Sequence, residues 1–336
     1  MSAVERVVVT LGGVGRLEVV GPAGRLAAWL SDPDLPQTVP GFSLGETAGG
    51  ADVSLVFQEA AARRCATGGQ GTVLQIAGDL ASLSRRDFRR LLMHAAKAAV
   101  ERRGGALVHA ACVLAPQGQR ILIGGSSGGG KTTLSLLLAG RGCRLLATDV
   151  TLLDEHCQVC AGTSHLTVYP QVLAACRPDL AEALPPGMAG AGSRSTGKIS
   201  LPRAMLEKEL LPSPFPTLQP VERVVRVALD VGANSWARYQ LDDQERLAES
   251  LILSESWARS VWICPTWEMF LPSLDDEIIR ARRWELAQKL ARRPHERLTG
   301  SFAGAVEALT SLGQQIPAGS TPSERGISTG HGGAIG

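Results

Sequence analysis

The residues in this chain most able to do chemistry form a glycine-rich run that ends in a lysine and hydroxyl residues. The run consists of Gly125, Ser126, Ser127, Gly128, Gly129, Gly130, Lys131, Thr132 and Thr133. It fits the phosphate-binding pattern G-x-x-x-x-G-K-[ST] at every fixed position. Residues without side chains let backbone N–H groups surround crowded phosphate oxygens. Lys131 adds a cation for the outer phosphates and the Thr132 hydroxyl can bind Mg²⁺, so the run predicts a site for Mg·ATP.

Such a loop needs a strand before it and a helix after it, and the sequence provides both. Residues 120–123 (RILI) predict a strand, and residues 132–140 (TTLSLLLAG) predict an apolar helix that ends at a glycine. The helix would direct the positive end of its dipole at the bound phosphates. This context favours a phosphate site over a glycine-rich linker that matches the pattern by chance.

An aspartate follows the next predicted strand. Residues 144–147 form a short apolar run, and Asp149 comes directly after it. At the C-terminal end of a neighbouring parallel strand, its carboxylate would face the phosphates, where it can hold the metal or accept a proton from an attacking hydroxyl. The other interpretation is a turn-forming aspartate. Because apolar residues resume at Val150, however, an ionised group here would be costly without a partner.

A second cation can come from a loop further along the chain. Residues 185–197 (PPGMAGAGSRSTG) are small and polar, carry Arg194, and lead to Lys198. Such a loop could close over ATP and bring a positive charge to the transferring phosphoryl group. The alternative is an exposed linker with solvated charges. Lys198 is the preferred candidate because it lies where ordered structure resumes.

Composition excludes several classes of protein. The 336 residues carry a net charge of +2 and only 4% aromatic residues, which argues against a dedicated nucleic-acid surface. No apolar run approaches the roughly twenty residues of a membrane span, and the N-terminal residues lack the features of a signal peptide. Seven scattered cysteines fit a reducing compartment. We therefore expect a soluble cytoplasmic protein with neither nucleic acid nor membrane as a partner.

The residues before the phosphate loop predict a small α+β region. Strands are expected at 7–10, 16–20, 53–58 and 71–77, with a short helix at 25–30 and a loop at 31–50. Ser84 is a good N-cap for a helix that ends at Gly104. The expected domains are an N-terminal α+β domain (1–104), a catalytic domain (105–316) and a polar, disordered tail (317–336).

The run from Leu107 to Asp154 resembles the core of the HPr kinase/phosphorylase family, with a histidine, a hairpin, the phosphate loop, Arg-Gly-x-Arg-Leu and an aspartate. The resemblance implies an α/β fold with a P-loop kinase core of the HPr kinase / phosphoenolpyruvate carboxykinase type. It implies that His109 is the active-site histidine and that Asp149 accepts the proton of the substrate hydroxyl. It also implies Lys131 as the loop lysine, Thr132 as the metal-binding hydroxyl, and an oligomeric protein.

Two departures point to a divergent branch of that family. Thr148 stands where the family has the first aspartate of a pair, and the family's later run with a second metal ligand has no match. Some proteins of this branch phosphorylate hydroxyls on small peptides during peptide natural-product maturation. The resemblance therefore implies a kinase for a serine or threonine of a peptide or small protein.

Other interpretations stay open. Without the resemblance, His109, expected in mid-strand, would be a core histidine. His156, Cys157, Cys160 and His165 suggest zinc, although alternating polarity favours a plain hairpin there. Trp257, Trp262 and Trp267 fit either core packing or an acceptor groove. Alternative functions are a shikimate- or gluconate-type small-molecule kinase, an amino-acid kinase, a transporter-type ATPase and a non-catalytic nucleotide sensor.

Overall fold

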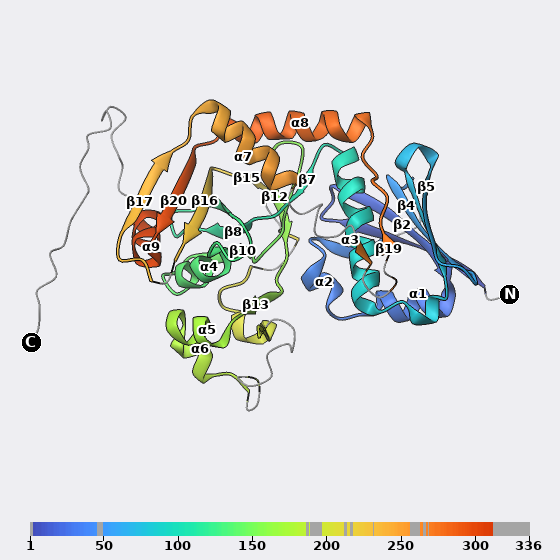
Figure 1. Cartoon of the computed structure of the whole chain (residues 1–336), viewed down its shortest axis with the longest axis horizontal. Helices are drawn as coiled ribbons and strands as arrows, with labels where there is room; N and C mark the ends of the chain where they lie inside the picture. Colours follow the sequence, from blue (N-terminus) through green and yellow to red (C-terminus); the bar gives the residue numbers. More distant parts are fainter. Residues whose placement is uncertain are drawn as a thin grey trace, which may run out of the picture.

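The computed structural model describes residues 3–45, 50–185, 188, 197–211, 214–215, 218–230, 232–255, 263–264, 267 and 269–311. They form two lobes side by side (Figure 1): an N-terminal lobe, from β1 to α3, and a loop lobe that carries the phosphate loop. Parallel and antiparallel strands occur in both, so the expected mixed α/β class is confirmed. The finer expectation of an HPr kinase-type core stays a prediction.

The N-terminal lobe is a six-stranded sheet with the order β3-β1-β2-β4-β6-β5. Its strands are β1 Val4–Leu11, β2 Gly15–Pro22, β3 Phe42–Gly45, β4 Val53–Glu59, β5 Arg64–Gly68 and β6 Val73–Gly78. Its helices are α1 Ala23–Leu30, α2 Leu35–Thr38 and α3 Arg85–Arg102, with 3₁₀ turns η1 Gly69–Gly71 and η2 Leu80–Ser82. The expected loop at 31–50 in fact contains α2 and β3. The sequence also missed β5, whose residues are mostly exposed and show no apolar alternation.

Helix α3 begins as its sequence predicts. The Ser84 hydroxyl accepts the N–H of Asp87 at 3.1 Å, which satisfies one of the donors left free at a helix N-terminus. Apolar residues such as Phe88, Leu91 and Leu92 are buried against the sheet. The helix ends at Arg102, and the chain then enters the loop lobe.

The loop lobe is built on a second six-stranded sheet, with the order β10-β8-β9-β16-β20-β17. These strands are β8 Ala111–Leu114, β9 Arg120–Gly124, β10 Arg144–Ala147, β16 Arg223–Leu229, β17 Trp236–Gln240 and β20 His295–Gly300. Strands β9, β16 and β20 run parallel. The phosphate loop follows β9, so it lies at the C-terminal edge of the parallel strands, where ligands bind in such sheets.

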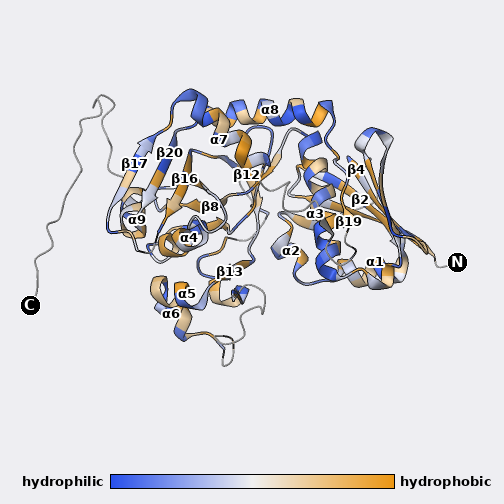
Figure 2. Ribbon diagram, in the orientation of Figure 1, coloured by the Kyte–Doolittle hydropathy of each residue, from blue (hydrophilic) through white to orange (hydrophobic). Residues whose placement is uncertain are grey.

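Helices cover both faces of this sheet (Figure 1). On one face, Ile121 and Ile123 of β9 pack with residues of α4 (Lys131–Ala139) and α9 (Phe302–Thr310). On the other face, Leu122 packs with residues of α7 (Asp243–Glu255) and α8 (Glu277–Ala291). A strand buried on both faces is apolar at successive positions, which is why this segment reads RILI. Figure 2 shows the same distribution, with hydrophobic residues along β8 and β16, and with hydrophilic and hydrophobic residues alternating along α8.

The remaining elements form small sheets and short helices around the main sheet. One four-stranded sheet has the order β15-β12-β11-β7. The elements are β7 Ala106–Val108, β11 Thr151–Leu153, β12 Gln158–Gly162, β13 Leu166–Val168, α5 Pro170–Cys176, α6 Pro178–Glu182, β14 Ile199–Leu201, η3 Arg203–Leu206, β15 Gln219–Pro220, β18 Ile263–Cys264 and β19 Met269–Phe270. None of the helices in the described part of the chain is long and apolar enough to cross a membrane.

Two expectations about the strands were wrong. His109, which the sequence places in mid-strand, instead separates two strands: β7 pairs with β11 in the small sheet, and β8 pairs with β9 in the large one. The N–H of His109 donates instead to the carbonyl of Leu253 in α7, at 3.0 Å. In addition, β10 is not adjacent to β9, because β8 lies between them, and the parallel neighbour of β9 is β16.

One of the hydrophobic clusters extends across both lobes. Leu107 and Leu152 of the loop lobe belong to the cluster that fills the N-terminal lobe, as does Trp267. Trp267 is buried and its indole N–H donates to the Ser82 hydroxyl at 3.0 Å, so it serves as core rather than as an acceptor groove. Trp257, Trp262 and the tail at 317–336 lie outside the described residues. A division into separate domains after residue 104 stays a prediction.

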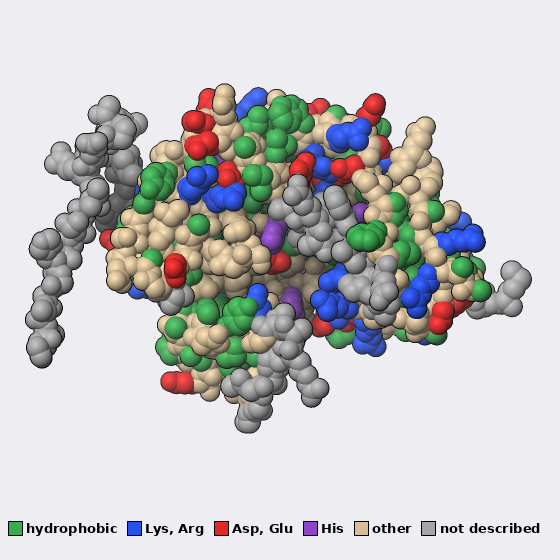
Figure 3. All heavy atoms as spheres, viewed as in Figure 1, with side chains coloured by type: hydrophobic (Ala, Val, Ile, Leu, Met, Phe, Trp, Pro, Cys, Tyr) green, Lys and Arg blue, Asp and Glu red, His purple; other side chains and the backbone are tan. Residues whose placement is uncertain are grey.

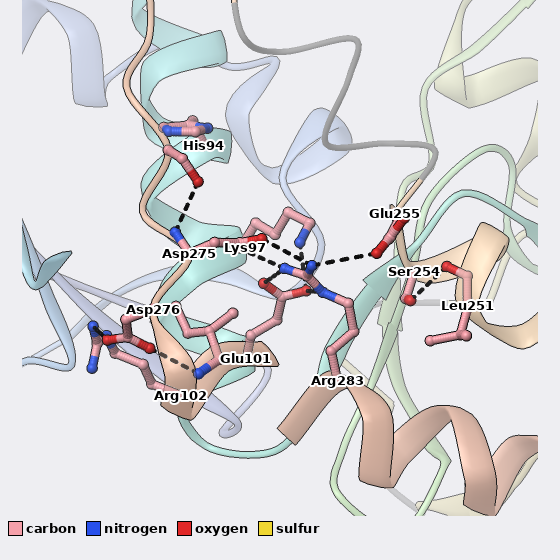
Figure 4. Close-up of polar contacts among 12 residues, drawn as sticks. His94, Lys97, Glu101, Arg102, Leu251, Ser254, Glu255, Asp275, Asp276 and Arg283 are labelled. Atoms are coloured by element: carbon pink, nitrogen blue, oxygen red, sulfur yellow. Dashed lines mark hydrogen bonds and ion pairs between the residues drawn. The ribbon is translucent and has the colours of Figure 1, made fainter. Parts of the chain in front are cut away.

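A buried charge cluster also joins the lobes (Figure 4). Arg283 of α8 makes a two-pronged contact with Glu101 of α3, at 3.0 and 2.9 Å, and a second one with Asp275, at 3.0 and 2.7 Å. Lys97 also pairs with Glu101. Burial opposes the charge of Arg283, but the hydrogen bonds to Glu101 and Asp275 outweigh it and raise the pKa of Arg283 above its ordinary value.

We expect Arg283→Met to lower the free energy of unfolding by about 3–5 kcal/mol, because removing one partner of a buried pair leaves charge without compensation. Glu101 is 1% exposed, and among the described residues Lys97 would be its remaining ion-pair partner. Urea denaturation measures the change. Arg282→Met is the matched control, since Arg282 pairs with Glu285 on the exposed face of the same helix, and we expect a change within about 0.5 kcal/mol. Equal losses in the two variants would contradict the prediction.

Candidate active site

A cavity of about 530 Å³ opens at the edge of the main sheet, beside the phosphate loop. The sequence-predicted site residues that line it are His109, Ser126, Ser127, Gly128, Gly130, Lys131, Thr132, Thr133, Asp149 and Lys198. Gly125 and Gly129 belong to the loop but do not line the cavity. Figure 3 shows histidine and acidic side chains together in the hollow between the lobes. The fold therefore brings together segments that lie far apart in the sequence.

The loop uses glycine where the backbone has no room for a side chain. Gly130 has φ +94°, and a Cβ there would lie 2.9 Å from the ring of Phe302. A Cβ on Gly125 would lie 2.5 Å from the carbonyl oxygen of Val227 in β16. The carbonyl of Gly129 also accepts the N–H of Leu229 at 3.1 Å. The loop is thus packed against β16 and α9, which fixes its shape before any ligand binds.

Lys131 lies inside the loop. Its ammonium donates to the carbonyls of Gly125 and Ser126, at 2.8 and 3.2 Å. Burial lowers its pKa below the ordinary lysine value, although the Asp149 carboxylate opposes the shift. Helix α4 begins at Lys131, one residue earlier than expected. The N–H groups of its first turn, including those of Thr132 and Thr133, have no acceptor within the helix and can donate to a phosphate.

His109 and Asp149, which both line the cavity, form a pair. Nε2 of His109 lies 3.2 Å from Oδ1 of Asp149, and the Asp149 side chain is 54% exposed. The backbone N–H of Asp149 donates to the Thr163 hydroxyl at 3.1 Å, which fixes the turn. Burial alone would raise the pKa of the Asp149 carboxyl, but His109 and the two cavity lysines lower it below its ordinary value. Asp149 is therefore ionised at neutral pH and able to accept a proton.

We expect His109→Ala to raise the pKa of the Asp149 carboxyl. His109 lowers that pKa through a hydrogen bond and through charge, so its removal leaves the effect of burial less opposed. As the solution is acidified, Asp149 of this variant would take up a proton at a higher pH than Asp149 of wild type. Any activity that needs ionised Asp149 would be lost at that higher pH as well. Titration of the Asp149 carboxyl by ¹³C NMR measures the change. His156→Ala is the control, because His156 is exposed and pairs with Glu155; a larger effect from this variant would contradict the assignment.

Thr148, which precedes Asp149, has a structural role. It is 2% exposed, and its hydroxyl lies 2.7 Å from the carbonyl of His165 and 3.0 Å from that of Thr163. A hydroxyl can donate to these carbonyls, whereas a carboxylate in the same place would face oxygens of like charge. This explains why threonine suits a position at which the resembled family has aspartate.

Lys198 reaches the cavity, while Arg194 lies outside the described residues. The Lys198 ammonium lies 5.2 Å from the centroid of the Tyr169 ring, a cation–π distance, and both side chains line the cavity. Lys198 is followed immediately by β14, which pairs with β13. A short two-stranded sheet thus fixes the chain directly after this cavity-lining lysine.

Several cavity residues were missed by the sequence analysis. Asp230 follows β16, the strand next to β9, and an apolar strand that ends in an acid was a signal that could have identified it. Phe302 comes from α9 and His165 from the segment before β13. Nothing local in the sequence marks either of these two, because they reach the cavity only through the tertiary fold.

The zinc alternative receives no support from the described residues. They contain no group of three or more His, Cys, Asp and Glu side chains that could hold a metal ion. Residues 151–162 form the hairpin β11–β12 that the alternating polarity favoured. Burial raises the pKa of Cys157 to about 11 and that of Cys160 to about 12, so both thiols stay protonated at neutral pH.

Comparisons with known proteins leave the family open. No protein-family model matches the chain, and no match is found among curated proteins. Among solved structures, one similar chain is the Hpr(Ser) kinase/phosphatase from Coxiella burnetii. The identity is 19% and the TM-score 0.22, over 40% of this chain and 76% of that chain. A likeness this weak carries no argument about fold or activity.

Proposed function

We propose that this protein is an ATP-dependent kinase that transfers the γ-phosphoryl group to a hydroxyl. The observation that carries the proposal is the cavity, whose lining combines residues of the phosphate loop with the His109–Asp149 pair. In this assignment residues 125–133 bind the phosphates of ATP. Lys131, Lys198 and His109 stabilise the negative charge of the transferring phosphoryl group.

The reaction needs a base for the acceptor hydroxyl, and Asp149 fits that role. The acceptor oxygen forms a bond to the γ-phosphorus while the bond from that phosphorus to the bridging oxygen breaks. ADP leaves, and the hydroxyl proton passes to Asp149. A carboxylate with a lowered pKa suits a loose transition state, in which the proton is transferred late.

The cavity also has suitable groups for Mg²⁺, which would neutralise charge on the outer phosphates. The Thr132 hydroxyl and the Asp149 carboxylate are hard oxygen donors, and Mg²⁺ usually takes only one or two such protein groups beside phosphate oxygens. Asp230 adds a second carboxylate. It directly follows β16, the strand that runs parallel beside β9, and P-loop NTPases hold their Mg²⁺ with an aspartate at a similar place. We assign Thr132 and Asp149 as metal ligands, with Asp230 as a further candidate.

For the acceptor, we propose a serine or threonine of a peptide or small protein. The resemblance over residues 107–154 supports this class, and the cavity that holds the proposed base opens to the surface of the protein. A shikimate- or gluconate-type kinase usually begins near its phosphate loop, whereas here a whole N-terminal lobe precedes the loop. The His109–Asp149 pair favours an enzyme over a nucleotide sensor, because binding alone needs no base.

The experiment that tests the proposal is intact-mass spectrometry of candidate acceptors after incubation with Mg·ATP. The panel contains peptides with one central serine or threonine and randomised flanks, any short peptide encoded beside the gene, HPr, and free serine and threonine. A gain of one phosphoryl group on a peptide supports the proposal. Transfer to a free amino acid alone indicates a small-molecule kinase, and nucleotide binding without any transfer indicates a sensor.

A further inference from the structure

His165 lines the cavity but has no part in the phosphate site described above. It lies between β12 and β13, and both of its ring nitrogens are close to the Ser200 hydroxyl, at 3.4 and 3.3 Å. The charged groups that act on the ring are Asp34, Arg89 and Asp149. They include the proposed base, and the carbonyl of His165 accepts the hydroxyl of Thr148, the residue directly before Asp149, at 2.7 Å. His165 therefore lies beside the turn that carries Asp149, where an acceptor hydroxyl must lie to give up its proton.

The backbone of His165 is fixed from two directions. The N–H groups of Ser164 and His165 both donate to the carbonyl of Gln37 in α2, at 2.9 and 3.2 Å. The carbonyl of His165 accepts from the Thr148 hydroxyl at 2.7 Å. One anchor belongs to the N-terminal lobe and the other to the turn that carries Asp149. The backbone of His165 is thus fixed relative to the turn that carries the proposed base, and such support is what a binding residue at a reacting centre requires.

The surroundings of His165 favour a neutral imidazole. Burial lowers its pKa, Arg89 adds to this effect, and Asp34 and Asp149 oppose it. A neutral ring has one N–H donor and one nitrogen acceptor. It can therefore exchange a hydrogen bond with a backbone amide or a hydroxyl without bringing a second full charge beside Asp149.

We propose that His165 is an acceptor-binding residue: its imidazole hydrogen-bonds to the peptide backbone beside the reactive serine or threonine and directs the hydroxyl toward Asp149. This proposal rests on the kinase function proposed above. It assigns the N-terminal lobe a share in the acceptor site, because α2 holds His165 through the Gln37 carbonyl. It also gives the buried Thr148 hydroxyl an indirect role as a positioning group.

The test compares His165→Ala with wild type, using the panel peptide that wild type phosphorylates best. We expect KM for that peptide to rise about tenfold, the factor that corresponds to one lost hydrogen bond of ~1.4 kcal/mol. The affinity for a non-hydrolysable ATP analogue, measured by calorimetry, should stay within about twofold. His165→Asn, which keeps a donor and an acceptor, should recover part of the loss. His156→Ala, on the exposed hairpin turn, should match wild type.

Each outcome decides a different point. An unchanged KM in His165→Ala would overturn the acceptor role while leaving the kinase function intact. Equal losses of peptide and nucleotide binding would also overturn it, since they would show a general disturbance of the cavity. Wild-type protein that binds nucleotide but phosphorylates nothing would reject the kinase function, and the acceptor role with it.

Thr148→Val provides a second check, because loss of the hydroxyl that holds His165 should raise KM for the peptide and leave nucleotide affinity unchanged.

Discussion

Asp149→Asn is expected to lower the rate of phosphoryl transfer by about 10²–10⁴-fold, the usual contribution of a general base, while nucleotide binding persists. The amide has nearly the same shape as the carboxylate and still offers an oxygen to a metal ion, but it cannot accept the acceptor's proton. His109 lies 3.2 Å from the Asp149 carboxylate and would keep a polar partner. Single-turnover transfer measures the rate, and calorimetry with a non-hydrolysable ATP analogue measures binding.

The control for this variant is Asp243→Asn. Asp243 stands in the first turn of α7, and its side chain is 89% exposed. We expect wild-type transfer from it. Full transfer in Asp149→Asn would remove Asp149 from the role of base and shift attention to His109. A parallel loss of nucleotide affinity would instead show that Asp149 acts mainly through the metal.

The sequence predicts best those features that depend on neighbouring residues. The RILI strand, the phosphate loop and the TTLSLLLAG helix follow one another directly, so their pattern needs no tertiary information. The structure adds the reason for the glycines: Gly125 packs against the carbonyl of Val227 and Gly130 against the ring of Phe302. The Ser84 cap of α3 was predictable for the same reason, because the serine and its partner Asp87 lie in one turn.

The errors come from the choice of strand partners. Apolar residues run from Ala106 to Leu114, and nothing in that run shows that β7 pairs with β11 while β8 pairs with β9. The break between these strands places His109 at the cavity, which a continuous strand would not explain. The position of β8 between β9 and β10 likewise depends on long-range pairing that local periodicity does not encode.

The cavity is only partly visible in the sequence for the same reason. Asp149 could be found because it lies soon after the phosphate loop, and the apolar strand before it is regular. Asp230 and His165 reach the cavity through β16 and the small sheet β13–β14, and their roles depend on which strands lie side by side. In the sequence, Thr148 was only a departure from the resembled family, whereas its contacts show a hydroxyl that supports the 163–165 segment.

Lys131→Ala is expected to lower the affinity for ATP by about 100-fold and to remove turnover. A hydrogen bond to a charged group contributes about 1.5–3 kcal/mol, and this lysine supplies the cation that the fold holds inside the loop. The variant would also leave the carbonyls of Gly125 and Ser126 without the donor that now lies 2.8 and 3.2 Å away. Calorimetry with a non-hydrolysable ATP analogue measures the affinity, and Lys208→Ala, at an exposed position after η3, is the control.

Binding that is equal in Lys131→Ala and wild type would place the nucleotide elsewhere. Every role assigned above depends on phosphates lying against this lysine, so that result would withdraw Asp149 and His165 from the reaction as well.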